Sequence, residues 1–349
     1  MAEQPETPLV NGVDPELVNG PRTNNIKTKQ MSKHTSHDQC IAVTPPKEPS
    51  TCHIPSKSPS QSPTANDINA NGDIINPPPS PSLASVAARL HAQITTFLSE
   101  YHDPSSLLFR VQEQTRISLG VVREALTRFS LHELSLSYNG GKDCLVLLLL
   151  FLASLHPLPS PASSINGHNV GASDETCASP RAPPSCIPAI YAQPKYPFPS
   201  VEQFVTSSSQ QYHLSLIRYP TDPPHTTIRS TFAAYLDKHP GIRAIFVGTR
   251  RTDPHGANLT HFDRTDHGWP DFVRIHPVID WHYVEIWAFI RHLGIDYCPL
   301  YDEGYTSLGG TNDTHPNPKL IVNKGNANGV TYRPAYELIE DEEERLGRD

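Results

Sequence analysis

No stretch of this sequence is long and apolar enough to cross a lipid bilayer. The longest apolar run, Leu145–Leu155, is well short of the roughly 20 residues that a spanning helix needs. The first ten residues are acidic and contain neither the apolar segment of a secretory signal nor the arginines of a transit peptide. We therefore expect a cytoplasmic protein without a membrane partner.

Basic residues and cysteine pairs are also scarce. Lys and Arg total 28 against 36 Asp and Glu, a net charge of −8 at pH 7, whereas a nucleic-acid-binding surface is normally basic. Part of the excess is the acidic run 340–344, so we expect the folded part to be nearer neutral. The six cysteines form no CxxC pair, which favours reduced thiols. A protein zinc site is not expected, because no metal-ligand spacing relates His255, His261, His267 and His276.

Proline, by contrast, is abundant. Many of the 36 prolines lie in the first 83 residues beside Ser, Asn and Thr. Such a segment buries too little apolar surface to offset the entropy of ordering. We expect a disordered leader over residues 1–82 and one monomeric domain over 83–349. A flexible insertion is expected at 157–184, where Pro, Ser, Ala and Gly again dominate.

The domain shows a regular alternation of short strands and helices. Apolar residues at a 3.6-residue period predict helices from Leu83 to about Leu98 and over 107–129. Strands are predicted at 133–137, 187–192, 212–218 and 242–247, with helices at 143–155, 201–210, 228–239 and 283–292. This order predicts a Rossmann-like α/β fold, a mainly parallel twisted sheet with helices on both faces. Ligands of such sheets bind at the carboxyl ends of the strands.

The strongest local motif is SYNGGKDC, residues 137–144, between a predicted strand and a predicted helix. Two adjacent glycines let the backbone turn sharply, and the helix N-terminus favours an anion. The motif lacks the Walker A pattern and resembles the PP-loop of ATP pyrophosphatases. A tight turn without a ligand is the weaker interpretation. Lys142 alone could be a solvated charge, and Cys144 is expected to be a small buried apolar residue.

A second motif, GTRRTDP at residues 248–254, follows the predicted strand at 242–247. Adjacent arginines at a sheet edge suit a phosphate through bidentate donation. The alternative is an ion pair at the surface of a loop. We favour a ligand, because this loop and the glycine-rich turn are predicted at the same edge. Farther on, Trp269 could stack on a flat ring or pack under its loop, whereas Trp281 and Trp287 are expected in the core.

Together these motifs resemble the eukaryotic FAD synthases, the FMN adenylyltransferase branch of the PAPS reductase-like PP-loop superfamily. The resemblance spans roughly residues 84–348. The matching pieces are SYNGGKDC (137–144), GTRRTDP (248–254), TDHGWPDFVRIHPVIDW (265–281), YTSLG (305–309) and PAYELIEDEEERLGR (334–348). The resemblance implies an adenine nucleotide alpha hydrolase-like fold with an irregular C-terminal flavin-binding extension. It also implies Mg²⁺-dependent transfer of AMP from ATP to the phosphate of FMN, with FAD and pyrophosphate as products.

The resemblance further implies roles for individual residues. Catalysis would involve Asn139, Asp143, Asp253, Arg345 and Arg348, with Asp143 as the candidate Mg²⁺ ligand and both arginines on a last helical turn. Substrate binding would involve Ser137, Tyr138, Gly140, Gly141, Lys142, Gly248, Arg250, Arg251, Trp269 and Arg274. The sequence departs from the family pattern at Ala192-Gln193-Pro194, which replaces an acidic turn, and at His255, where Tyr or Phe is common.

Three alternatives remain open on the sequence. A PAPS or APS reductase needs a nucleophilic cysteine in a C-terminal motif, and the tail beyond Pro299 contains no cysteine. A non-catalytic nucleotide-binding module would keep the glycine-rich turn without needing Arg250, Arg251 and Asp253. A tRNA-thiolating PP-loop enzyme should show a basic surface and paired cysteines, which this sequence lacks.

Overall fold

The computed structural model describes residues 81–158, 184–326 and 329–349. The predicted disordered leader and most of the predicted flexible insertion lie outside these residues, so both stay predictions. All described residues fall in one compact unit. Within these residues, no helix combines the length and the apolar character needed to cross a membrane.

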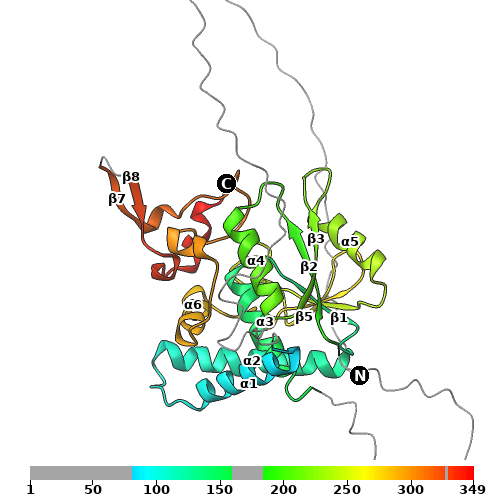
Figure 1. Cartoon of the computed structure of the whole chain (residues 1–349). Helices are drawn as coiled ribbons and strands as arrows, with labels where there is room; N and C mark the ends of the chain where they lie inside the picture. The colour runs from blue at the N-terminus through cyan, green and yellow to red at the C-terminus, as the bar shows by residue number, and fades with distance from the viewer. Residues whose placement is uncertain (1–80, 159–183, 327–328) are drawn as a thin grey trace, which may run out of the picture. The chain divides into compact units, whose positions relative to one another are not determined.

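Six strands form a sheet in the order β3-β2-β1-β4-β6-β5 (Figure 1). In chain order they are β1 (Leu134–Ser137), β2 (Ile187–Gln193), β3 (Leu214–Pro220), β4 (Ala244–Phe246), β5 (Phe262–Arg264) and β6 (Val273–Ile275). The pairs from β3 to β6 are parallel, and edge strand β5 runs antiparallel to β6. The mainly parallel sheet is thus confirmed. Strands β5 and β6 were not predicted, because each has only three residues among turn-forming neighbours.

Every helix predicted from the sequence is present, with ends within two residues of the expected ones. The helices are α1 (Leu83–Ser99), α2 (Leu107–Arg128), α3 (Lys142–Ser154), α4 (Pro199–Gln211), α5 (Ile228–Lys238) and α6 (Tyr283–His292). Hydroxyl side chains cap several N-termini: Ser82 accepts a bond from the Ser85 N–H, and Ser106 from the Phe109 N–H. Such caps satisfy amides that have no partner inside the helix.

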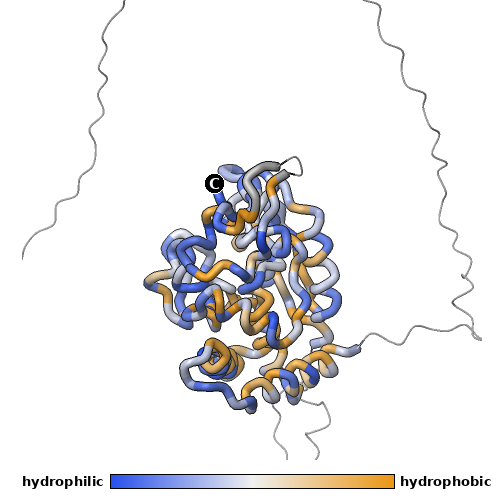
Figure 2. Tube along the Cα trace, turned by 90° about the vertical axis from the view of Figure 1, so that its left-hand side faces the viewer, coloured by the Kyte–Doolittle hydropathy of each residue, from blue (hydrophilic) through white to orange (hydrophobic). Residues whose placement is uncertain are grey.

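Helices cover both faces of the sheet, as predicted. The alternation of strand residues shows this at β1, where Leu136 joins the larger apolar cluster while Ser135 turns to the other face and meets the hydroxyl of Tyr235 on α5 at 2.8 Å. Helix α3 lies in the larger cluster and buries every residue from Leu145 to Ala153. The tube in Figure 2 shows polar and apolar residues alternating along the helices at the bottom of the molecule, as expected for helices with one buried face.

The C-terminal part is irregular, in agreement with the expected extension. It contains the 3₁₀ segments η1 (Pro299–Glu303), η2 (Pro318–Leu320), η3 (Ala335–Glu337) and η4 (Asp341–Gly347), and the hairpin of β7 (Ile321–Asn326) and β8 (Gly329–Tyr332). In Figure 1 these elements, in orange and red, lie together beside α4. Among them, η1 lies against α4 and η3, and η4 lies against η2 and α6.

Two expectations about the last residues are wrong. The acidic run is not apart from the folded part, because Glu344 is only 5% exposed and pairs with buried cations. Arg345 and Arg348 do not share a turn of α-helix, since η4 is a 3₁₀ helix that ends at Gly347, and Arg348 follows it in extended conformation. A 3₁₀ helix is tighter than an α-helix and is usually short. Helix η4 therefore ends within the segment 334–348, before Arg348.

The burial of α3 gives a test of the fold. Replacing Leu148, which is fully buried, by Ala should lower the free energy of unfolding by about 2–5 kcal/mol, because it removes apolar contacts and leaves a cavity. The control is Ile117→Ala on α2, where the side chain is 47% exposed. Urea unfolding followed by circular dichroism measures both, and equal losses would contradict the packing described.

Candidate active site

The two sequence motifs meet at the carboxyl ends of β1 and β4, which are neighbours in the sheet. From β1 the chain proceeds to β2 on one side, and it returns to β4 on the other side only after β3. This reversal of strand order is where open α/β sheets bind their ligands. A cavity of about 410 Å³ opens there, and both motifs line it. The prediction that the two turns share one cleft is confirmed.

The cavity wall has three parts. The glycine-rich turn contributes Asn139, Gly141, Lys142, Asp143 and Cys144; the loop after β4 contributes Gly248, Thr249, Asp253 and Pro254; and the C-terminal part contributes Tyr301, Ser307, Leu308, Glu344 and Arg345. Ile228 at the start of α5 completes it.

The glycine-rich turn has a shape that only glycine allows. Gly140 has φ +74°, and a Cβ there would lie 2.8 Å from a methyl group of Val205. The next amide, Gly141 N–H, donates to Asn139 Oδ1 at 2.9 Å, and Gly141 begins α3 as its N-cap. The Lys142 N–H donates to the Tyr301 hydroxyl at 2.9 Å. The N-terminus of α3, which carries a partial positive charge, therefore lies at the cavity.

Two buried cations lie behind the turn. Arg250 is 0% exposed and Lys142 is 1% exposed, which excludes both the surface ion pair considered for Arg250 and the solvated charge considered for Lys142. The Lys142 Nζ contacts Asp143 at 2.9 Å and Glu344 at 2.5 Å. The Arg250 guanidinium contacts Asp143 at 2.8 Å and also pairs with Glu344. Glu344 thus joins both cations from the far end of the chain.

Two further carboxylates extend this ion network. Asp341 lies 3.5 Å from Arg250, accepts the Tyr283 N–H at 2.7 Å and pairs with His282 at the start of α6. Asp253 accepts the Arg250 backbone N–H at 2.8 Å. Lys142 and Arg250 therefore face four carboxylates, an excess of two negative charges.

The network sets the protonation of its members. Burial opposes ionisation of Asp143, but the neighbouring charges of Arg250 and Lys142 outweigh it and lower the pKa of Asp143 below its ordinary value. Burial likewise opposes the charge of Arg250, yet Asp143 and Glu344 raise its pKa. Asp143 is consequently an anion and Arg250 a cation throughout the physiological pH range.

Cys144 and Gly248 hold the two motifs together. A Cβ on Gly248 would lie 2.8 Å from the Cys144 sulfur and 2.9 Å from its backbone nitrogen, so the loop after β4 approaches α3 as closely as a chain without a side chain allows. The thiol behaves as the small apolar residue expected, and burial, followed by the charge of Asp143, raises the pKa of Cys144 to about 12.

Several predicted site residues hold the framework instead of lining the described cavity. Tyr138 is buried and donates its hydroxyl hydrogen to Ser208, and Ser137 ends β1. Arg251 pairs with Asp280 at 2.6 Å and donates to two backbone carbonyls. Arg348 donates to the Leu308 carbonyl at 2.7 Å. Their proposed contacts with substrates stay predictions.

Trp269 and Arg274 lie on the β5–β6 side of the sheet. The Trp269 ring contacts Phe232 edge to face and remains 37% exposed. The ring therefore packs against its neighbour and still has exposed surface on which a flat ring could stack. Arg274 lies 3.3 Å from Asp266 and donates to the Arg264 carbonyl at 3.0 Å. Trp281 and Trp287, expected in the core, are 1% and 2% exposed, which confirms that assignment.

Sequence reasoning missed Glu344, Asp341 and Tyr301. Each is far from both motifs along the chain. Asp341 and Glu344 lie in the matching segment 334–348, but nothing in that segment indicates that they pair with buried cations. The balance of charge was the one available signal. If Lys142 and Arg250 were buried they would need carboxylates beside them, and the acidic run 340–344 contains such carboxylates.

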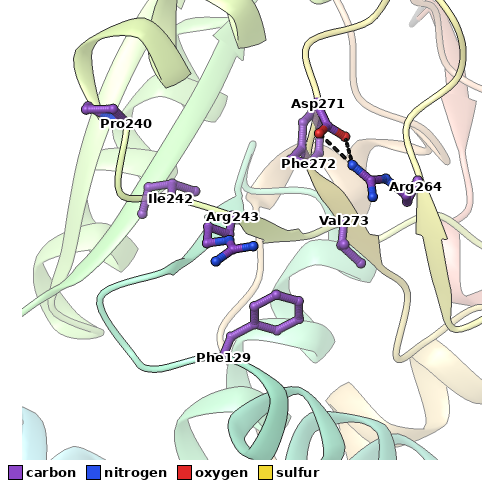
Figure 3. Close-up of a pocket in the computed structure, with 8 residues that line it drawn as sticks. All are labelled: Phe129, Pro240, Ile242, Arg243, Arg264, Asp271, Phe272 and Val273. Atoms are coloured by element: carbon purple, nitrogen blue, oxygen red, sulfur yellow. Dashed lines mark hydrogen bonds and ion pairs between the residues drawn. The ribbon is translucent and has the colours of Figure 1, made fainter.

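A second cavity, of about 440 Å³, lies at the opposite edge of the sheet (Figure 3). Ile242 and Arg243, which line it, directly precede β4, and Val273 begins β6. Its Arg264 is already held by Asp271, with two bonds of 2.6 Å. The amino ends of the strands are not the usual place for a ligand, so the cavity at the carboxyl ends is the candidate active site.

Known proteins of similar sequence identify the family of this chain. The model of the phosphoadenosine phosphosulfate reductase domain matches residues 133–316, just over half of the chain. The probable FAD synthase of Schizosaccharomyces pombe is 38% identical over 246 residues, which are 70% of this chain and 83% of that protein. The chain belongs to the FAD synthase family.

Other members of this family give the same result. The flavin adenine dinucleotide synthase of Saccharomyces cerevisiae is 33% identical over 69% of this chain and 78% of its own length. The crystal structure of Candida glabrata FMN adenylyltransferase in complex with FMN and the ATP analogue AMPCPP is 27% identical, with a TM-score of 0.66 over 77% of this chain and all of that chain. The same enzyme in complex with FAD and pyrophosphate has a TM-score of 0.67 over 76% of this chain and 99% of its own. The resemblance seen in the sequence motifs is confirmed.

The close approach at Gly248 in this FAD synthase family member can be tested directly. Gly248→Ala should lower the free energy of unfolding by about 1–3 kcal/mol, because the new methyl group overlaps the backbone of Cys144. Gly241→Ala is the control, since a Cβ at Gly241 meets nothing within 4 Å. Urea denaturation compares the two variants, and a Gly248→Ala protein as stable as its control would refute the contact.

The role of Glu344 gives a second prediction. Glu344→Gln should cost about 3 kcal/mol of unfolding free energy, since it removes a carboxylate that pairs directly with both buried cations at once. The neighbouring change Glu343→Gln is the matched control, because Glu343 pairs with the exposed Lys319 and such pairs contribute less than about 1 kcal/mol. The comparison uses denaturant unfolding, and similar losses at both positions would remove Glu344 from the network.

Proposed function

We propose that this chain is an FAD synthase that transfers AMP from ATP to the phosphate of FMN, releasing pyrophosphate. The observation that carries the proposal is the meeting of the glycine-rich turn and the loop after β4 at one cavity. Family membership supports the same chemistry, because the solved relatives bind FMN with an ATP analogue and FAD with pyrophosphate. The proposed enzyme acts as a cytoplasmic monomer and does not engage nucleic acid.

ATP is assigned to the turn 139–143. The backbone there approaches the cavity without side chains at Gly140 and Gly141, and the N-terminus of α3 favours the negative triphosphate. Arg345, which lines the cavity from η4, adds a cation that can contact the phosphates directly. We expected Arg250 to bind substrate. Its guanidinium instead pairs with carboxylates, so Arg250 fixes the positions of Asp143 and Asp253.

FMN is assigned to the side of the cavity formed by the loop after β4. Asp253 lines that side, and its second oxygen is fixed by the Arg250 backbone. The FMN phosphate is already an anion at neutral pH, so its oxygen can attack the α-phosphorus of ATP without a strong general base. Catalysis then depends on holding the two anions in line and offsetting their charge, which is the usual requirement of phosphoryl chemistry.

The carboxylates of the cavity suit Mg²⁺. Oxygen atoms are the ligands that Mg²⁺ prefers, and Asp143 and Asp253 both line the cavity. The Asp143 Oδ1 is buried and lies 2.8 Å from the Arg250 guanidinium, an ion pair whose geometry is not that of a hydrogen bond. The two surplus negative charges of the ion network would be offset by one divalent cation. When bound, Mg²⁺ would neutralise charge on the phosphates; Asp143 and Asp253 are the residues that would hold it.

Thiol chemistry of the reductase type is not supported by Cys144, which is partly buried, or by Cys298, which is buried. Cys144 lines the cavity, but its thiol stays protonated because of its raised pKa, and burial raises the pKa of Cys298 to about 11. The thiolate is the nucleophilic form of cysteine. These two cysteines are therefore poorly suited to attack a sulfonucleotide.

The decisive assay is incubation of the full chain with ATP, Mg²⁺ and FMN, with FAD measured by chromatography and pyrophosphate by a coupled reaction. We expect both products in equal amounts. Asp143→Asn should lower kcat/KM by about 100-fold or more, as losses of a group that positions transferring phosphates do. Asp237→Asn, on the exposed side of α5, is the control and should retain full turnover.

Two results would contradict the proposal. Binding of ATP and FMN without formation of FAD would leave a non-catalytic nucleotide-binding module. Full activity of Asp143→Asn would remove Asp143 from catalysis.

A further inference from the structure

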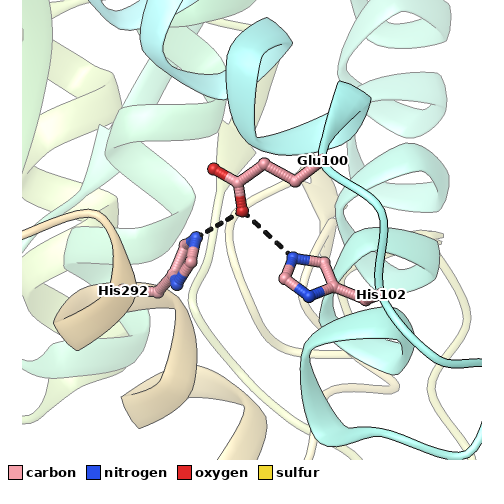
Figure 4. A group of neighbouring side chains, drawn as sticks. All are labelled: Glu100, His102 and His292. Atoms are coloured by element: carbon pink, nitrogen blue, oxygen red, sulfur yellow. Dashed lines mark hydrogen bonds and ion pairs between the residues drawn. The ribbon is translucent and has the colours of Figure 1, made fainter.

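Three side chains from separate segments meet outside the active site (Figure 4). Glu100 is the C-cap of α1, His102 lies two residues later in the connection to α2, and His292 is the last residue of α6. The Glu100 Oε2 lies 3.0 Å from His102 Nε2 and 2.7 Å from His292 Nε2. One carboxylate oxygen and two imidazole nitrogens thus point at one small volume, with all three atoms within 4.8 Å of one another.

We propose that Glu100, His102 and His292 form a binding site for Zn²⁺. In a tetrahedral zinc site with bonds of about 2.0–2.1 Å, ligand atoms are about 3.3 Å apart. The two separations from the Glu100 oxygen are 3.0 and 2.7 Å, which is about 0.3 and about 0.6 Å shorter than that value. An outward movement of the side chains by about that much would admit the ion. Two imidazoles and one carboxylate suit zinc better than Mg²⁺ or Ca²⁺, which prefer oxygen ligands alone.

The backbone that carries these ligands is held firmly in place. Gln112 on α2 is 2% exposed, and its amide donates to the Phe97 carbonyl at 2.6 Å and to the Glu100 carbonyl at 2.9 Å. The His292 ring packs against Phe97, with ring centroids 5.1 Å apart. The buried amide fixes the end of α1 relative to α2, and the ring contact fixes it relative to α6. A fixed set of donors lowers the cost of binding a metal.

One side of the cluster remains open to solvent. The side chains of Glu100, His102 and His292 are 36%, 17% and 28% exposed. A bound ion could therefore enter from solvent and keep a water molecule as its fourth ligand, the arrangement of zinc sites with three protein ligands. The ion would join α1 to α6 in addition to the apolar contacts between them.

Helix α6 connects this cluster to the ion network of the active site. His292 ends the helix, while at its start the Tyr283 N–H and the His282 ring hold Asp341, which faces Arg250. A ten-residue helix is about 15 Å long, so the two sites are distinct. The zinc site is expected to act through stability, and the basal reaction does not require it.

The test begins with the full chain treated with a chelator and then titrated with Zn²⁺ at neutral pH by calorimetry, alongside thermal unfolding. We expect one equivalent to bind and Tm to rise. His102→Gln and His292→Gln should each weaken binding by roughly 100-fold or more, since each removes a direct ligand. His132→Gln is the matched control, because His132 is exposed on the turn between α2 and β1 and should leave binding unchanged.

Co²⁺ provides a measurement that needs no variant. The intense visible absorption of tetrahedral Co²⁺, displaced by one equivalent of Zn²⁺, would support the site. The weak absorption of octahedral Co²⁺, or equal affinities of the His102→Gln, His132→Gln and unaltered chains, would overturn it and leave the cluster as hydrogen bonds alone. FAD formation is measured separately, so failure of the zinc site is distinguishable from failure of the proposed enzyme.

Discussion

The burial of two cations behind the glycine-rich turn is the constraint around which the active-site edge is built. Lys142 and Arg250 have almost no exposed surface, and a buried charge is tolerated only when it is paired and hydrogen-bonded. Their partners come from the turn, the loop after β4 and the C-terminal segment. Satisfying the two charges therefore brings three distant parts of the chain to one place, and the cavity is what remains between them.

The alternation of strands and helices made the fold predictable. Helix α3 was identified by its uninterrupted apolar run, and β1, β2 and β3 by short runs between turns, because local patterns decide these elements. Strands β5 and β6 escaped prediction, since their three residues lie among turn-forming neighbours, whereas the equally short β4 lies within the predicted strand 242–247. The edge shared by both motifs followed from general rules of parallel sheets, whereas the order of the strands was not predicted.

The site was only partly predictable, because many of its contacts join residues that are far apart in the sequence. The motifs at 137–144 and 248–254 were found because their glycines and charged residues are not needed to form a helix or strand. The sequence did not show the different roles of the residues in these motifs: Arg250 pairs with carboxylates, whereas Asp143 and Asp253 line the cavity. Glu344 and Tyr301 are recognisable only in three dimensions, since nothing adjacent to either residue in the sequence indicates its partner.

The position of Glu344 has a consequence for synthesis of the protein. Helix α3, the sheet strands and Arg250 all precede it by many residues, so these parts leave the ribosome first. Until residue 344 follows, Lys142 and Arg250 have Asp143 as a shared partner but lack Glu344, the second carboxylate that pairs with both. A nascent chain can collapse around its apolar core, yet the edge that carries the two motifs gains its final electrostatic balance only once residue 344 has been synthesised.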